Sequence, residues 1–385
     1  MIHTSITLIL TLSLLLWVSP FIAKMLRIPI PAVEIMLGSL AAYMGVIEHN
    51  EYFDLIAEVG FLYLMFLAGM EVDLKRITKS PRNVMQRSIL FLALMLLFSV
   101  TSGLLFDLHP IVIISMPLIS IGLLASLSKT YGKEQPWIRL ALIAGVLGEV
   151  LSIAALTIFD VASATGFNFA LIVKISYLVL FLVSVYLLYH SLHLLFWWFP
   201  ELKNTLVPKF DTSDQDVRLS MALFFIMIAV MLYLGLELAL GSFIAGVAIS
   251  AFFHHEKRLE EKMSSLGFGF LVPLFFIHVG TSFDLNAVVI KGVVSGALLI
   301  TALMIISRIL AAVSLKQIIG SKNALLVALS LSMPLTLLIA VATIGHETKQ
   351  LDQLSYYQMI LASIFEILIA MIMIKVLQKE PKKKK

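Results

Sequence analysis

The chain has 385 residues, of which 60% are hydrophobic and 14% are charged, and its net charge is +4. Soluble domains are about 45–50% apolar and about 25% charged, so this composition indicates an integral membrane protein. The absence of cysteine excludes disulfides, thiolate metal sites and cysteine nucleophiles. The sequence contains no phosphate-binding glycine loop, nucleophile elbow or HExxH motif, so we expect a protein that is not an enzyme and needs no cofactor.

Apolar stretches of about 17–25 residues, the length that crosses a bilayer, follow one another along the chain. The N-terminal stretch lacks a basic segment and a small-residue cleavage site, so it is typical of a first transmembrane helix rather than a signal peptide. We predict an all-α polytopic membrane protein with about thirteen transmembrane helices, near residues 4–22, 30–47, 55–71, 87–106, 110–129, 137–159, 169–197, 218–235, 237–253, 265–281, 290–314, 323–344 and 355–377.

The distribution of positive charge predicts the orientation of these helices. With the N-terminus outside, 24 of the 28 lysines and arginines fall in inward-facing segments and three fall in outward-facing ones. Inward-facing loops of membrane proteins carry this excess of positive charge. We therefore predict an outside N-terminus and a cytoplasmic C-terminus. The basic tail 378–385 is expected to contact anionic lipid and not nucleic acid.

Short segments recur in the same order in the two halves of the chain. They are Glu34–Ser39 with Glu237–Ser242, Gly60–Leu62 with Gly269–Leu271, and Ser115–Leu118 with Ser332–Leu335. Each match pairs helices that are seven apart, so the two copies cross the membrane in opposite directions. We predict an inverted-topology repeat of helices 2–6 and 9–13, which is typical of secondary transporters.

The sequence SMPL places Pro117 and Pro334 in the middle of two predicted helices. Secondary transporters interrupt paired helices near the bilayer midplane, where the substrate site lies. Unwound backbone is tolerated at that depth only where it is buried in protein or lines a polar cavity. Two ordinary proline kinks are the alternative interpretation. The match between the repeats favours two discontinuous helices.

Glu149 is the strongest candidate for an ion-binding side chain. It lies about ten residues, or roughly 15 Å, inside its predicted helix, which is the midplane of a core about 30 Å thick. Burial there favours the protonated form of a carboxyl group. The group could carry a proton or, once deprotonated, supply oxygen ligands to a monovalent cation. A protonated structural glutamate is the alternative.

Arg308 and Glu366 also lie within predicted spans. A buried arginine needs a carboxylate, a carbonyl or water, so Arg308 would suit as a counter-charge that stabilises the emptied site. Extension of its side chain to the headgroups is the alternative. Glu366 follows Ser332 by the 34 residues that separate Glu149 from Ser115. It is therefore the repeat mate of Glu149, and we expect it to be a partner of Arg308 or a supporting acid.

Two further ionisable side chains are expected to lack a role in transport. Glu34 lies near the start of its predicted helix, where an acid interacts favourably with the helix dipole and touches headgroup water. His278 is expected to pack or to lie at the interface rather than to relay protons.

Four stretches resemble a known family of membrane proteins. They are GFLYLMFLAGMEVDLKRI at 60–77, LALGSFIAGVAIS at 238–250, LGFGFLVPLFFIHVGTSFDL at 266–285, and Ser115–Leu156. These stretches resemble the bacterial monovalent cation/proton antiporters, the superfamily of sodium/proton and potassium/proton exchangers. The resemblance covers the whole predicted membrane region and is strongest to the branch of the potassium efflux antiporters.

The resemblance implies a homodimer in the bacterial inner membrane. Residues 1–377 would form the transmembrane antiporter domain, ahead of the tail. Its implied parts are a dimer part at about 1–71 and 218–281, a moving core at about 87–159 and 290–377, and a linker helix at about 169–197.

The resemblance also implies roles for individual residues. Helices 5 and 12 would cross at unwound segments, one around Pro117 and Ser120 and the other around Pro334 and Thr336. The cation-binding acid of the family falls on Glu149.

Two further positions follow from the same resemblance. The basic residue of the family's eleventh helix falls on Arg308. The residue before the acid, which is a carboxylate or an amide in the family, is Gly148 in this chain. A single carboxylate at this pair makes one proton per cation the simplest stoichiometry, so electroneutral exchange is expected.

We therefore predict a secondary active transporter that exchanges Na+ or K+ for H+ by alternating access, with both ions competing for Glu149. The identity of the cation stays open, because oxygen cages for Na+ and K+ differ in size rather than in residue type. One alternative is a sodium-coupled symporter of organic anions with the same fold. Another is a non-transporting sensor or a cation channel on this scaffold.

Overall fold

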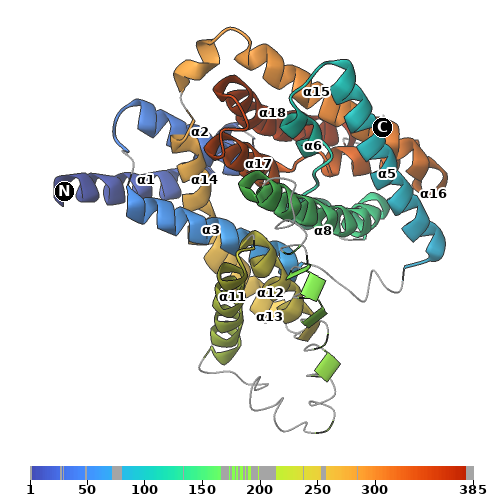
Figure 1. Cartoon of the computed structure of the whole chain (residues 1–385), viewed down its shortest axis with the longest axis horizontal. Helices are drawn as coiled ribbons and strands as arrows, with labels where there is room; N and C mark the ends of the chain where they lie inside the picture. The colour runs from blue at the N-terminus through green and yellow to red at the C-terminus, as the bar shows by residue number, and fades with distance from the viewer. Residues whose placement is uncertain are drawn as a thin grey trace, which may run out of the picture. The chain divides into compact units, whose positions relative to one another are not determined.

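Figure 1 shows the protein as a computed structural model of the whole chain. The structure describes residues 2–26, 28, 30–47, 50–71, 80–132, 134–165, scattered positions between 173 and 198, 214–236, 238–252, 257–283 and 285–378. All regular secondary structure in these residues is helical. Most of the predicted linker helix 169–197 and residues 379–385 of the basic tail lie outside the described residues.

The chain forms two units that are described separately. The first comprises Met1–Glu58, Lys75–Ile153 and Pro273–Lys385, and the second comprises Val59–Leu74 and Ala154–Val272.

The helices of the first unit are α1 (Ile2–Leu26), α2 (Ile30–Tyr43), α5 (Arg82–Leu105), α6 (Pro110–Ser115), α7 (Gly122–Tyr131), α15 (Val293–Ala311), α16 (Lys316–Ser330), α17 (Leu335–Glu347) and α18 (Gln353–Gln378), with the short 3-10 helices η2 (Leu285–Val289) and η3 (Ala312–Leu315). The second unit contains α11 (Gln215–Leu234), α12 (Leu238–Phe252), α13 (Lys257–Leu266) and the π-helix η1 (Gly267–Leu271). Three helices have residues in both units, namely α3 (Glu51–Met70), α8 (Pro136–Thr165) and α14 (Val272–Thr281).

Eight helices in the described residues are long and apolar enough to cross a membrane. One of these apolar runs, Val293–Ser330, is 38 residues long and covers parts of two predicted spans. Gly320 divides this run, because its φ of 78° and ψ of 165° are not helical. Glycine adopts positive φ at no steric cost, so the chain can change direction there.

Two non-helical segments interrupt the apolar helices at the two SMPL sequences. The first comprises residues 116–121, because α6 ends at Ser115 and α7 begins at Gly122. The second lies between Ser330, where α16 ends, and Leu335, where α17 begins. Helix α6 contacts α17, and α7 contacts α16. Each half of one interrupted helix therefore lies beside a half of the other.

Close helix contacts in each unit depend on glycine. In the first unit, a Cβ on Gly38 of α2 would lie 2.1 Å from the carbonyl oxygen of Ile277 on α14. In the second unit, a Cβ on Gly246 of α12 would lie 2.0 Å from the carbonyl oxygen of Phe66 on α3. Small residues let membrane helices approach this closely. The two contacts join predicted helix 2 to helix 10 and helix 9 to helix 3, which are corresponding pairs of the proposed repeat.

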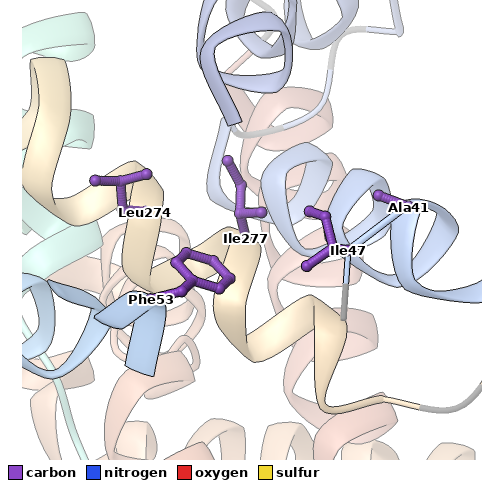
Figure 2. Close-up of a cluster of buried hydrophobic side chains, with 5 residues drawn as sticks. All are labelled: Ala41, Ile47, Phe53, Leu274 and Ile277. Carbon is purple, nitrogen blue, oxygen red and sulfur yellow. The ribbon is translucent and has the colours of Figure 1, made fainter. Parts of the chain in front are cut away.

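A buried apolar cluster holds α2, α3 and α14 together in the first unit. Figure 2 shows its members, Ala41, Ile47, Phe53, Leu274 and Ile277. Partly buried leucines of α1 pack against this cluster. The cluster and the glycine contact at Gly38 join the same pair of helices, α2 and α14, so this part of the unit is closely packed.

Candidate functional site

Glu149 lies on α8, is fully buried, and faces the first non-helical segment. Helix α8 approaches this segment through two glycines. A Cβ on Gly148 would lie 2.5 Å from Cδ1 of Ile119, and a Cβ on Gly145 would lie 2.7 Å from Cγ2 of Ile121. A larger side chain at either position would force the side chains of the segment to shift. This contact is a physical reason for a glycine, rather than a second carboxylate, before Glu149.

The two carboxylate oxygens of Glu149 have different surroundings. Its Oε2 atom accepts a hydrogen bond of 3.2 Å from the backbone N–H of Ile121, and the buried Ser120 side chain lies near the same carboxyl group. Its Oε1 atom is buried and has no hydrogen-bond partner in the part of the chain that the structure describes. One oxygen is therefore anchored to the interrupted helix, while the other is available to a proton or a cation.

The described residues contain no group of three or more acidic or histidine side chains that could hold a metal ion. A monovalent cation needs only oxygen ligands, which a carboxylate, a hydroxyl and backbone carbonyls can supply. Glu149, Ser120 and the backbone of residues 116–121 contain these three kinds of oxygen atom.

Ser152 also connects α8 to the first non-helical segment. Its Oγ atom donates to the carbonyl oxygen of Gly148 at 2.7 Å and accepts from the backbone N–H of Ile119 at 2.8 Å. Sequence reasoning did not single out Ser152. Its spacing of three residues from Glu149, which places both on one helix face, was the available signal.

Arg308 of α15 is fully buried, so its side chain does not extend to the headgroups. Helix α15 packs against α5 and α18 (Figure 1). The Nη1 atom of Arg308 donates to Glu366 Oε1 of α18 at 3.1 Å and to the Met304 carbonyl at 3.0 Å. Its Nη2 atom donates to the Leu118 carbonyl at 2.6 Å. Arg308 thus joins Glu366 to the first non-helical segment.

Among the described residues, Arg308 forms its ion pair with Glu366 and not with Glu149. Glu366 is fully buried, and its Oε2 atom has no hydrogen-bond partner within the described residues. The expected partnership of Arg308 and Glu366 is therefore present in the structure. Glu149 forms no ion pair within those same residues.

The second non-helical segment contains Pro334, which precedes the first residue of α17 and has a non-helical ψ of 44°. Leu331 of this segment lies close to α8, because a Cβ on Gly145 would be 3.1 Å from Leu331 Cδ2. Helix α8 therefore contacts both interrupted helices. The side chain of Thr336 lies outside the described residues.

Two other ionisable side chains lie away from these segments. Glu34 is 2% exposed and accepts a hydrogen bond of 3.2 Å from Ser19 of α1, so the expected contact with headgroup water is wrong. Glu34 lies in the second turn of α2, which packs against α1. This packing shields the acid from water although Glu34 is near the start of its helix. His278 is half-buried, contacts Asp54 at 2.8 Å and packs edge-on against Phe53.

A family model described as "Sodium/hydrogen exchanger, transmembrane" matches residues 9–380, which is nearly the whole chain. The chain belongs to the sodium/hydrogen exchanger family. The resemblance to monovalent cation/proton antiporters is thus confirmed at the level of the family.

Two relatives of this chain are named as Na(+)/H(+) antiporters. It is 24% identical over 414 residues to the Bacillus subtilis protein named "Putative Na(+)/H(+) antiporter YjbQ", a match that covers 100% of this chain and 66% of that protein. The chain therefore spans just under two thirds of that relative's length. It is 23% identical over 369 residues to the Na(+)/H(+) antiporter of Enterococcus hirae, covering 92% of this chain and 93% of that protein.

A solved structure shows the same fold. It is the sodium proton antiporter MjNhaP1 from Methanocaldococcus jannaschii at pH 8, which matches with a TM-score of 0.64 and 15% identity over 97% of this chain and 99% of that one. With the family assignment, this likeness shows that the chain has the all-helical fold of a sodium/hydrogen exchanger and is a multi-pass membrane protein. The named relatives are transporters of ions and not enzymes.

Proposed function

We propose that this protein exchanges a monovalent cation, Na+ or K+, for H+ by alternating access, and that Glu149 is the shared binding site. The observation that carries the proposal is the environment of its carboxyl group. One oxygen is anchored by the backbone of an interrupted helix, and the other is buried without a partner in the described residues. A buried carboxylate in that position is expensive unless it holds a proton or a cation.

The cation would be held by oxygen atoms that already surround Glu149. The Ser120 hydroxyl lies near the same carboxyl group and could turn its lone pair toward a cation. Backbone carbonyls of the first non-helical segment would complete the cage, because interrupted transporter helices offer such carbonyls to ions. Gly148 has no side chain to contribute and serves to bring α8 close to this segment.

Charge balance favours an electroneutral exchange. Arg308 and Glu366 are paired at 3.1 Å, so their charges cancel within the core. Glu149 then remains as the one acid of the site with no basic partner among the described residues. Replacing one bound proton by one monovalent cation leaves the net charge of the site unchanged. One cation per proton follows from this arithmetic.

The wider architecture that we propose comes from the family resemblance. About thirteen helices would form an inverted repeat whose interrupted helices 5 and 12 cross, as the contacts of α6 with α17 and of α7 with α16 favour. The dimer part would be about 1–71 and 218–281, and the moving core about 87–159 and 290–377. The protein would be a homodimer in the bacterial inner membrane, with its N-terminus outside and its C-terminus in the cytoplasm.

Proteoliposome flux tests this proposal. A pH gradient is imposed, NaCl, KCl or LiCl is added, and a pH-sensitive dye reports its dissipation. We expect wild type to dissipate the gradient with Na+ or K+ and Glu149→Gln to be inactive. Glu34→Gln is the matched control, because it also neutralises a buried acid, but one whose hydrogen bond among the described residues is to Ser19 of α1 and not to an interrupted helix.

The outcomes separate the alternatives. Full exchange by Glu149→Gln would rule out this residue as the shared site. Uptake of an organic anion that needs Na+ but not Glu149 would identify a symporter instead. Exchange whose rate changes with an imposed membrane voltage would contradict the electroneutral stoichiometry.

A further inference from the structure

Side chains of two other helices hold the backbone of the first non-helical segment. Groups freed from a helical hydrogen-bond ladder must find other partners, since a buried unpaired N–H or C=O is costly. The pairs are Ile119 N–H with Ser152 at 2.8 Å, Ile121 N–H with Glu149 at 3.2 Å, and the Leu118 carbonyl with Arg308 at 2.6 Å. The unwound conformation therefore depends on α8 and α15.

Ser152 differs from Glu149 and Arg308, the other two residues whose side chains bond to this segment, because it carries no charge. It is 5% exposed, and its single hydroxyl both donates to Gly148 and accepts from Ile119. These two bonds tie the α8 backbone, at the residue before Glu149, directly to the segment that faces Glu149. Because the hydroxyl donates to one backbone and accepts from the other, it fixes the distance between α8 and the non-helical segment.

We propose that Ser152 is a positioning residue that sets which monovalent cation fits at Glu149. This inference rests on the proposed function. The cage would take the carboxylate from α8 and carbonyl oxygens from residues 116–121, so its size depends on the separation of these two elements. Ser152 sets that separation without touching the ion. Na+ and K+ need oxygen cages of different size, so a change in this separation changes their relative affinities.

Removal of the hydroxyl should therefore alter selectivity more than rate. Ser152→Ala leaves the Ile119 N–H without its partner, and the segment can then relax away from α8. We expect the apparent KM for the preferred cation to rise about fivefold, the effect of losing one hydrogen bond. The KM for the other cation should change less, so the ratio of the two KM values moves toward one. The kcat should change less than twofold.

Ser115→Ala is the matched control for this substitution. Ser115 is also a buried serine beside the non-helical segment, but its hydroxyl donates only to the Val112 carbonyl of its own helix, at 2.8 Å. This variant should keep the wild-type ratio of KM values. Ser152→Thr retains the hydroxyl and should restore the ratio toward that of wild type.

The experiment measures KM and kcat for Na+, K+ and Li+ in proteoliposomes for all three variants. A KM ratio does not depend on how much protein is active, so reduced folding of Ser152→Ala does not obscure the result. A wild-type ratio in Ser152→Ala, or the same altered ratio in Ser115→Ala, would overturn the inference. Absence of cation/proton exchange in the wild type would instead overturn the proposed function itself.

Discussion

Arg308 and Glu366 form an ion pair of 3.1 Å between α15 and α18, and neither side chain has any exposed surface. Arg308 also donates to the Leu118 carbonyl in the first non-helical segment. Removing one member of a buried pair leaves the other charge without compensation, whereas replacing both by apolar side chains is often close to neutral. The pair is thus an energetic unit that also reaches the interrupted helix.

Arg308→Met should lower the free energy of unfolding by about 3–5 kcal/mol, because Glu366 would remain buried and unpaired. The double variant Arg308→Met/Glu366→Met should recover more than half of this loss. The remainder reflects the Leu118 carbonyl, which loses its donor in both proteins. Thermal unfolding in detergent measures the stability of wild type, the single variant and the double variant. Equal stability of the single and double variants would show that the pair is not an energetic unit.

The pH dependence of exchange should follow competition at Glu149. Protons and cations that occupy one carboxylate exclude each other, so lowering the pH should raise the apparent KM for the cation while the maximal rate stays constant. The increase should approach about tenfold per pH unit once the group is mostly protonated, by mass action. Rates measured over a range of cation concentrations at several pH values test this. An effect of pH on the maximal rate alone would indicate separate sites.

The contact between Gly148 and Ile119 predicts a compensating pair of substitutions. Gly148→Ala places a Cβ 2.5 Å from Ile119 Cδ1 and 3.0 Å from Ile119 Cβ, so the Ile119 side chain must shift, together with the non-helical segment that carries it, at a cost of about 1–3 kcal/mol. Exchange should fall because Glu149 moves away from the Ile121 N–H. Ile119→Ala in the same protein removes the colliding atoms and should restore part of the activity. Failure of the double variant to exceed Gly148→Ala in flux would argue against this explanation.

Gly38→Ala should separate α2 from α14, because its Cβ would lie 2.1 Å from the Ile277 carbonyl oxygen. We expect a loss of about 1–3 kcal/mol in the free energy of unfolding. Gly269→Ala is the control, since a Cβ there has no atom within 4 Å among the described residues. Thermal unfolding of the two variants distinguishes them. A similar loss in Gly269→Ala would mean that glycine conformation, and not close packing, sets the cost.

Sequence reasoning located the interrupted helices and proposed Glu149 as the candidate acid because both inferences depend on local properties. An apolar run fixes depth in the bilayer through the rise of 1.5 Å per residue, so the position of an acid within the run gives its depth. Proline lacks an N–H and cannot continue a helical ladder, so Pro117 and Pro334 mark the non-helical segments directly. The same reasoning was wrong for Glu34, whose neighbour Ser19 belongs to another helix.

Hydropathy and proline act over a few residues, so the amino-acid sequence was enough to predict a many-helix membrane protein with two interrupted helices, and to propose Glu149 as an acid at mid-depth. The packing of the helices was needed to show that Arg308 joins Glu366, 58 residues away, and Leu118, 190 residues away. It also decided that Ser152 ties α8 to the interrupted helix. These choices depend on which apolar helices pack together, and helices of similar hydropathy carry no local signal of their neighbours.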